Sequence, residues 1–294
     1  MENKVNDVLA LVPLTEEGKI VLKQATYLQK VIPYRIFVLN IIPAVSPLKH
    51  LFSSRKEKEL KDKALKMLVE FLKDFYKGKI PENVIPMILM GNTVQTLVRQ
   101  AQSENFCFMI LKRSLHQKEN QNLLDQSEID KIIGHSRCPV LLINEDSTPD
   151  NLKNILIPID ISERTEKKLL WASLFAQKNK AKIHIISALK INIKEQKSLA
   201  SKNANEIQKM LLERGIESEV TVLKVYDKVK HEAVLNYIET KNTDMIIIRK
   251  HQVASYENTT IGDFAKEIIH RSVVPVFIVG QSQSDIANIL HKHL

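Results

Sequence analysis

The segment IIHRSVVPVFIVG (residues 268–280) has a close echo, IIGHSRCPVLLIN (residues 132–144), earlier in the chain. Their prolines, Pro139 and Pro275, lie 136 residues apart (275 − 139), a spacing that suits one modest domain. A chain of 294 residues is long enough for two such domains. The echo therefore indicates that one fold occurs twice in succession.

Three further pairs of short apolar segments extend the repeat. They are LALVPLT and NILIPID (9–15 and 154–160), RIFVLNI and KIHIISA (35–41 and 182–188), and NFCFMILKRS and NTDMIIIRKH (105–114 and 242–251). Continuous apolar runs of this kind are typical of strands buried on both faces of a sheet, and segments with helical spacing lie between them. Strand alternating with helix, twice over, predicts two α/β domains with parallel sheets.

The polar connector NEDSTPDN (residues 144–151) separates the two copies. We expect one domain at residues 1–146, a second at 152–281, and a C-terminal tail at 282–294 whose role the sequence leaves open. Each copy ends in an apolar strand, CPVLLIN (138–144) or VPVFIVG (274–280). A bare apolar edge invites pairing, so the two last strands are predicted to pair with each other.

The composition, 44% apolar and 26% charged residues, is that of an ordinary soluble globular protein. No apolar run approaches the roughly 18 residues that span a bilayer, and the N-terminus does not resemble a signal peptide. The two cysteines, Cys107 and Cys138, form no CxxC pair, which favours a reducing compartment. We therefore expect a cytoplasmic protein with no membrane association. Cys107 falls in an expected buried strand, whereas Cys138 is expected to be more accessible.

The formal net charge of +9 raises the question of nucleic-acid binding. Much of this charge alternates with acids in the helical segment 55–77, where the lysines are expected to face solvent. The inward stripe of that helix is predicted to comprise Leu60, Ala64, Leu68, Phe71 and Phe75. With 5% aromatic residues and no nucleic-acid-binding motif, nucleic acid is not the expected partner, and a polyanion binder is a third interpretation.

Sequence motifs for catalysis and for metal binding are absent. The chain has no GxSxG elbow, no GxxxxGK[ST] loop and no GxGxxG fingerprint, which are the commonest signatures of hydrolases and nucleotide enzymes. It also lacks the HExxH and His–Cys spacings of metal sites. The sequence therefore predicts no catalytic residue and no metal ligand.

The chain resembles the universal stress protein family in its tandem two-domain form. The second copy carries the resemblance best, in ILIPIDISERTEKKLLWASLFA (155–176), DMIII (244–248) and GDFAKEIIHRSVVPVFIV (262–279). The first copy carries it more weakly, in GNTVQTLVRQA (91–101) and CPVLLIN. The resemblance implies two flavodoxin-like (Rossmann-like) domains, each a five-stranded parallel sheet of order 3-2-1-4-5 flanked by helices. It also implies a pseudo-dimer joined through the last strands.

Many members of that family bind ATP, through an aspartate after strand one and a glycine-rich stretch after strand four. Ligands in such sheets sit at the carboxyl ends of the strands, where the strand order reverses. In the second copy Asp160 matches the aspartate and Gly262 matches the last glycine, but Arg249 and Gln252 replace the earlier glycines. Asp263 stands where the family has a phosphate-binding hydroxyl, and its carboxylate would repel phosphate. Asp160 is equally well explained as the N-terminal residue of a helix.

The first copy departs further. Thr15 replaces the aspartate, Lys112 and Leu115 replace the first two glycines, and Gln126 replaces the last glycine. The sequence therefore predicts an intact ATP site in neither copy, and no cofactor.

Basic residues follow strand four in both copies: Lys112 and Arg113 in the first, Arg249 and Lys250 in the second. Two explanations stay open for the second pair. In the first, Arg249 and Lys250 form a repurposed site for a smaller phosphorylated ligand. In the second, Arg249 pairs with Asp263 or Asp160 and closes the pocket.

These observations predict a non-enzymatic stress-response protein that acts by binding or interaction, with an unknown protein partner. The alternative is binding of ATP or another nucleotide by the second domain only. The candidate ligand residues are then Asp160, Arg249, Lys250, Gly262 and Asp263. Whether the pseudo-dimer pairs again into a larger assembly is left open.

Overall fold

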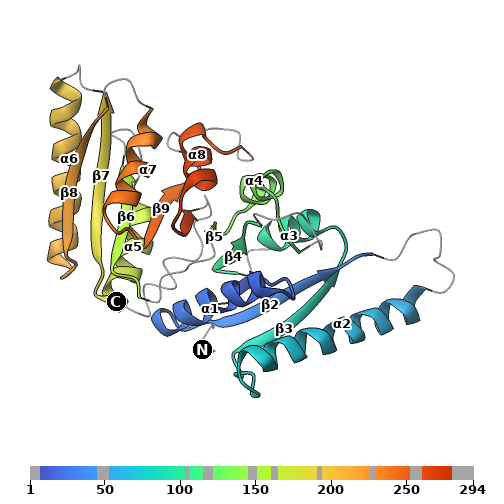
Figure 1. Cartoon of the computed structure of the whole chain (residues 1–294). Coiled ribbons are helices and arrows are strands. Elements are labelled where there is room, and N and C mark those ends of the chain that lie inside the picture. Colours follow the sequence, from blue (N-terminus) through green and yellow to red (C-terminus); the bar gives the residue numbers. More distant parts are fainter. Residues whose placement is uncertain are drawn as a thin grey trace. The chain divides into compact units, whose positions relative to one another are not determined.

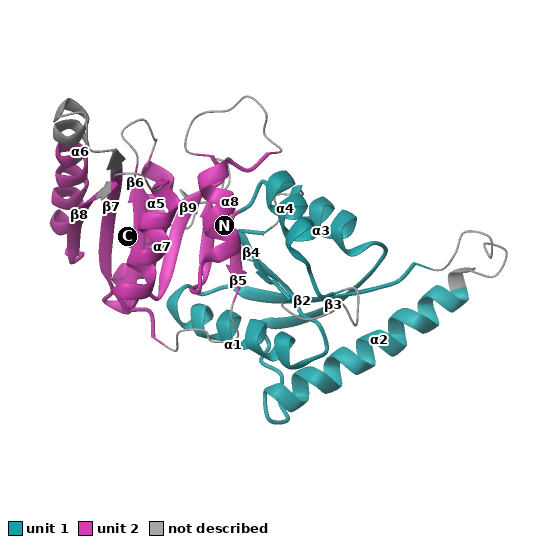
Figure 2. Cartoon of the chain, turned by 45° about the horizontal axis from the view of Figure 1, so that its top comes forward, with its two compact units in different colours: residues 1–138 teal, residues 139–294 magenta. Residues whose placement is uncertain are grey.

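The computed structural model describes residues 7–44, 53–102, 106–114, 122–144, 151–159, 165–190, 194–225, 229–251 and 260–279 (Figure 1). The chain divides into two compact units, Met1–Cys138 and Pro139–Leu294 (Figure 2). Both units are α/β, as the repeat predicts.

Unit 1 contains a parallel sheet in the order β3-β2-β1-β4. Its strands are β1 (Asp7–Leu11), β2 (Arg35–Ile42), β3 (Val84–Met90) and β4 (Phe108–Lys112). Its helices are α1 (Glu16–Val31), α2 (Ser53–Phe75), α3 (Thr93–Gln102) and α4 (Gln126–His135). Every residue of β4 is buried, which agrees with its continuous apolar run in the sequence.

Unit 2 contains a parallel sheet in the order β8-β7-β6-β9-β10, which is the expected 3-2-1-4-5 order. These strands are β6 (Asn154–Ile159), β7 (Lys182–Lys190), β8 (Ser218–Val225), β9 (Met245–Arg249) and β10 (Val276–Val279). The helices are α5 (Glu166–Asn179), α6 (Lys194–Glu213), α7 (Lys230–Thr240) and α8 (Asp263–Arg271).

Strand β5 (Val140–Ile143) adds to unit 2 by pairing antiparallel with β10. The register places Leu141 opposite Phe277, and both side chains are fully buried. Asn144, directly after β5, donates from Nδ2 to the carbonyl oxygens of Ile269 (2.8 Å) and Ser272 (3.1 Å) at the end of α8. The predicted pairing of the two last strands is therefore confirmed. Unit 2 begins at Pro139, although the sequence repeat assigns residues 138–144 to the first copy.

Three aromatic side chains form the centre of the unit 2 core. The ring of Phe277 in β10 lies 4.8 Å from Trp171 and 5.3 Å from Phe175, centroid to centroid, and both partners come from α5. All three side chains are almost completely buried. Helix α5 is thereby fixed on the sheet, and its first turn lies next to the carboxyl end of β6.

Helix α2 of unit 1 departs from the predicted burial. Leu68 and Leu72 are fully buried, but the side chain of Leu60, which the stripe places inward, is 44% exposed. Of the predicted stripe only Leu68 is buried; Ala64, Phe71 and Phe75 are half-buried. The prediction was wrong for Leu60 because the apolar period identifies one face of a helix without showing how far the rest of the protein covers it.

Candidate functional site

In unit 2 the strand order reverses between β6 and β9, so ligands are expected at the carboxyl ends of these strands. Strand β9 ends at Arg249, and Lys250 and His251 follow it directly. Asp160, which follows β6, lies outside the described residues, as does Gln252. The structure therefore describes the β9 side of the candidate site.

Backbone contacts tie the end of β9 to the start of α8. The N–H of Gly262 donates to the carbonyl oxygen of Lys250 at 3.0 Å, and Gly262 is the N-cap residue of α8. A Cβ atom at Gly262 would meet His251 Nδ1 and the Lys250 carbonyl oxygen at 3.7 Å, an ordinary contact distance. The packing of the described chain therefore does not itself require glycine at this position.

Four basic side chains gather at this edge: Lys167, Arg249, Lys250 and His251, here called the basic cluster. Lys250 and His251 are only 4% and 9% exposed. Burial lowers the pKa of Lys250 to about 8. Burial also lowers the pKa values of Lys167 and His251, and the charge of Arg249 lowers both further. Lys167, Arg249 and Lys250 therefore bring poorly solvated positive charge to this edge, whereas the lowered pKa of His251 favours its neutral form at neutral pH.

Three further contacts or polar atoms lie in or beside the basic cluster. A hydrogen bond with the Thr260 backbone acts on His251 in the direction that raises its pKa, against the stronger effect of burial. His251 Nε2 is buried and has no hydrogen-bond partner among the described residues. The neighbouring Lys168, also buried, donates from Nζ to the carbonyl oxygen of Pro158 in β6.

Asp263, the first residue of α8, is exposed, and within the described ranges it forms no ion pair with Arg249. The proposed closure of the pocket by Arg249 and Asp263 is therefore not formed, and the alternative pairing with Asp160 falls outside the described residues. Because the Asp263 carboxylate faces solvent, its repulsion of a bound anion would be weakened by water and salt.

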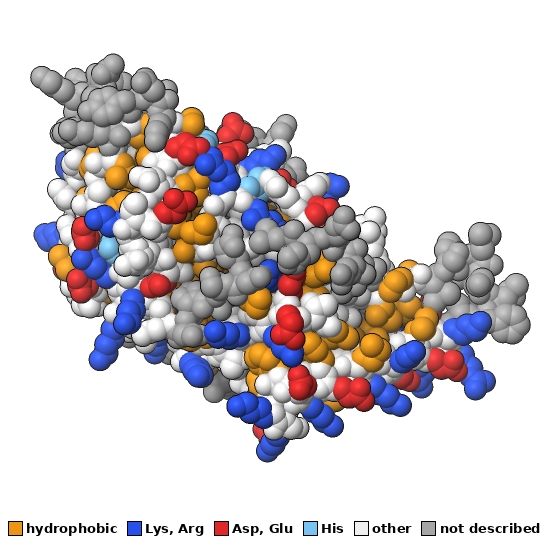
Figure 3. All heavy atoms as spheres, in the orientation of Figure 1, with side chains coloured by type: hydrophobic (Ala, Val, Ile, Leu, Met, Phe, Trp, Pro, Cys, Tyr) orange, Lys and Arg blue, Asp and Glu red, His pale blue; other side chains and the backbone are white. Residues whose placement is uncertain are grey.

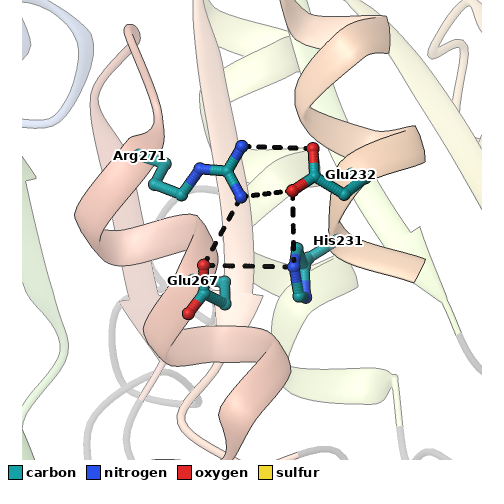
Figure 4. Close-up of polar contacts among 4 residues, drawn as sticks. All are labelled: His231, Glu232, Glu267 and Arg271. Carbon is teal, nitrogen blue, oxygen red and sulfur yellow. Dashed lines mark hydrogen bonds and ion pairs between the residues drawn. The ribbon is translucent and has the colours of Figure 1, made fainter. Parts of the chain in front are cut away.

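A polar network joins helix α8 to helix α7 (Figure 4). Arg271 of α8 binds Glu232 of α7 through both guanidinium nitrogens and lies 3.5 Å from Glu267. His231 Nε2 lies 3.8 Å from Glu232 and 3.9 Å from Glu267. Since α8 begins at Asp263, directly after its N-cap Gly262, this network helps to hold the helix whose start lies beside the basic cluster.

The equivalent edge of unit 1 is closed by its own side chains. Lys112 Nζ lies 3.9 Å from Glu17 Oε2 and donates to the carbonyl oxygen of Arg113, while Ser114 donates to Glu17 Oε1 at 3.1 Å. Gly18 allows α1 to approach this closely, because a Cβ there would lie 1.9 Å from the Pro13 carbonyl oxygen. Sequence reasoning missed Glu17, whose counterpart in the second copy, by the alignment of the two prolines, is a serine.

A buried amide also occupies the unit 1 edge. The Asn122 side chain accepts from the N–H of Ile41 (2.8 Å) and donates to its carbonyl oxygen (2.9 Å), so it binds both backbone polar groups of this residue near the end of β2. Asn40 donates to the carbonyl oxygen of Val12 at 2.9 Å. At this edge Lys112, Ser114 and the backbone of Ile41 are therefore bound by side chains of unit 1 itself.

Replacing Glu17 by glutamine is expected to destabilise the protein by about 1–3 kcal/mol, because the nearly buried Lys112 would lose its anionic neighbour. The measurement is the free energy of unfolding in urea, with Glu16→Gln as the matched control. Glu16 adjoins Glu17 in α1, but its side chain is 85% exposed and it pairs only at the surface, so a change below about 0.5 kcal/mol is expected. Equal effects of the two substitutions would contradict the internal closure.

The described residues contain no group of three or more His, Cys, Asp or Glu side chains that could hold a metal ion. None of the described helices is long and apolar enough to cross a membrane. Cys138 is only 6% exposed, so the expectation that it is accessible was wrong. The thiol of Cys107 is equally buried, and burial raises its pKa, which leaves it a poor nucleophile.

Comparisons with known proteins agree with this fold. Residues 151–280 match the model of the Universal stress protein family. A universal stress protein from Archaeoglobus fulgidus DSM 4304 is similar, with 22% identity and a TM-score of 0.72, over 96% of this chain and 100% of that one. A functionally unknown protein from Pseudomonas aeruginosa PAO1 is similar at 17% identity and a TM-score of 0.62, over 98% and 95% of the two chains.

The cytoplasmic domain of a prokaryotic cation chloride cotransporter is also similar, at 14% identity and a TM-score of 0.54, over 97% of this chain and 99% of that domain. No curated protein matches the sequence. At these identities the solved structures show the fold alone.

Proposed function

Because residues 151–280 form a universal stress protein domain, we propose that this protein acts by binding rather than by catalysis. We infer further that unit 2 binds a small phosphate-bearing anion at the basic cluster, without an ATP site of the family type and without a cofactor. The observation that carries the proposal is Lys250, a buried cation beside Arg249 and His251 at the edge where such sheets bind ligands.

The energetics of Lys250 favour an anion. A pKa of about 8, against 10.5 for an ordinary lysine, corresponds to an unfavourable free energy of about 3 kcal/mol for holding the charge at this place. An anion about 4 Å away would offset this, since opposite charges near a protein surface attract by about 4 kcal/mol at that distance. His251 Nε2 offers a further hydrogen-bonding atom.

The same residues disfavour ATP. In the family, glycines after strand four allow backbone N–H groups to approach the phosphates closely. Here Arg249 and Gln252 stand at those positions, and Asp263 stands at the hydroxyl position. A small anion needs only the side chains of the basic cluster, whereas a triphosphate must follow the backbone.

The proposal assigns the two units different roles. Glu17 and Asn122 of unit 1 bind groups of their own unit, so we assign the small ligand to unit 2 and a protein partner to unit 1. A two-unit protein of this kind would report the presence of an anion in unit 2 to a partner, with no chemical conversion of the ligand.

Calorimetric titration of the full chain tests the anion site. Inorganic phosphate, a sugar phosphate and Mg-ATP are titrated at low salt into the parent protein, into Arg249→Gln and into Lys178→Gln. Lys178 is exposed in the last turn of α5 and serves as the charge-matched control. Arg249→Gln is expected to weaken binding of the small anions by about tenfold or more, the value of one charged hydrogen bond, and the control is expected to bind normally.

Two results would decide against the proposal. Absence of heat with every anion in the parent protein would remove the site altogether. Mg-ATP binding that is tighter than phosphate binding, unaffected by Arg249→Gln and lost in Asp160→Ala would instead show a nucleotide site of the family type in the second unit.

A further inference from the structure

Helix α2 carries an apolar surface that the rest of unit 1 leaves open. Three of its side chains are exposed although they are large and apolar: Leu60 (44%), Leu65 (39%) and Met67 (50%). Between Arg55 and Met67 no side chain is buried, whereas Leu68 and Leu72 in the following turns are fully buried. The helix therefore packs on the sheet through its C-terminal half, and its N-terminal half extends beyond that contact (Figure 1).

Leu60 and Met67, together with the half-buried Ala64 and Phe71, follow the spacing of a helix–helix seam. Leu60, Ala64, Met67 and Phe71 succeed one another at intervals of four, three and four residues, which is the heptad pattern of a two-stranded coiled coil. None of these four side chains is buried. Figure 3 shows apolar side chains along α2 beside the row of charged side chains that the helix presents to solvent.

We propose that this seam, Leu60, Ala64, Met67 and Phe71, binds the same seam of a second copy of the chain, with the two α2 helices antiparallel. A second copy is the occupant that the charges fit. Residues 55–66 hold six basic and three acidic side chains, and residues 67–75 hold one basic and two acidic ones. Parallel helices would bring two basic halves together, whereas antiparallel helices place each basic half against an acidic one.

One pair of residues specifies the orientation. Lys63 and Glu70 are exposed, lie seven residues apart and flank the seam on the same side. When Ala64 of one copy faces Met67 of the other, Lys63 of each copy approaches Glu70 of the other, so the pair forms twice. Within one helix the two are about 10 Å apart along the axis, too far to bind each other.

This inference goes beyond the proposed ligand site and does not depend on it. The seam lies on α2 of unit 1 alone, so dimerisation would leave the β5–β10 pairing unchanged. The sequence left further dimerisation open, and the seam is the surface that we assign to it. A seam of four residues is small, so we expect a weak dimer that forms and dissociates with protein concentration.

Sedimentation equilibrium of the full chain over a wide concentration range tests the seam. Lys63→Glu and Glu70→Lys are each expected to weaken dimerisation about tenfold, because two attractive pairs become repulsive. The double variant Lys63→Glu, Glu70→Lys is expected to restore it to within about threefold of the parent. Met67→Glu is expected to abolish it, and Leu212→Glu, which alters an exposed leucine of α6 in unit 2, is expected to leave it unchanged.

Circular dichroism establishes that each variant is folded, and all the substituted side chains are exposed. A parent protein that stays monomeric at all concentrations would overturn the proposal. So would a dimer that survives Met67→Glu. Failure of the double variant to restore dimerisation would overturn the antiparallel arrangement, since that arrangement alone places Lys63 opposite Glu70.

Discussion

Replacing Phe277 by alanine is expected to lower the free energy of unfolding of unit 2 by about 3–5 kcal/mol, the usual effect of deleting a buried aromatic ring. Phe277 has no exposed surface and contacts the rings of Trp171 and Phe175. It also lies opposite Leu141 of β5 and beside Ile247 of β9. The substitution therefore leaves a cavity where α5, the sheet and the added strand meet.

The chain itself supplies the probe for this experiment. Its single tryptophan, Trp171, lies 4.8 Å from Phe277, so tryptophan fluorescence during urea unfolding reports on unit 2. Val273→Ala is the control, because Val273 is 42% exposed just before β10 and should change stability by less than about 0.5 kcal/mol. A loss below about 1 kcal/mol for Phe277→Ala would mean that the aromatic cluster is not the centre of the core.

The parts of the fold that follow from chain-local patterns were predicted from the sequence. The apolar runs that became β4 and β9 are continuous because both faces of each strand are covered, and that property is visible without a structure. The pairing of β5 with β10 was predicted because an apolar edge strand is unfavourable alone. Local pattern and final packing agree at these places.

Contacts between distant residues were beyond such reasoning. Glu17 and Ser114 are 97 positions apart, and Asn122 and Ile41 are 81 apart, so no periodicity links them. The extent of burial was equally hidden: the pattern of α2 predicts an apolar face, but only the fold shows that it covers Leu68 and leaves Leu60 open.

At the candidate site, too, the residues could be identified from the local sequence, whereas their burial could not. Arg249 and Lys250 were identified because the strand run ends there, and the carboxyl ends of such strands are where ligands bind. The burial of Lys250 and the solvent exposure of Asp263 depend on how α8 packs, whereas the sequence left open whether Arg249 pairs with Asp263 or Asp160 or helps to form an anion site. Side-chain direction at a helix start is set by tertiary packing.

Replacing Lys250 by methionine is expected to separate the binding role of this residue from a structural one. Methionine keeps the buried chain length and removes the charge, so the penalty of burying a cation disappears. At pH 7 we expect the variant to be more stable than the parent by about 1–3 kcal/mol and to have lost measurable phosphate binding. If Lys250 instead stabilised the fold, Lys250→Met would be less stable than the parent.

The dependence of stability on pH provides the second readout for Lys250→Met. The pKa of Lys250 is about 8 in the folded protein and 10.5 when unfolded. Below pH 8 both states carry the charge, and the penalty is fully present. Between about pH 8 and 10.5 the folded chain has released the proton while the unfolded chain retains it, so the parent gains stability as pH rises.

In Lys250→Met this gain should be missing, and the difference in unfolding free energy between parent and variant should shrink as pH rises through this window. Lys178→Met, at an exposed position of α5, should keep the parent profile. A variant that is destabilised at pH 7 and retains the rise above pH 8 would show that the Lys250 cation stabilises unit 2. In that case the basic cluster would be a structural feature, and the anion site would have to be abandoned. Higher stability together with lost phosphate binding would mean that the protein retains an unfavourable charge because its ligand needs it.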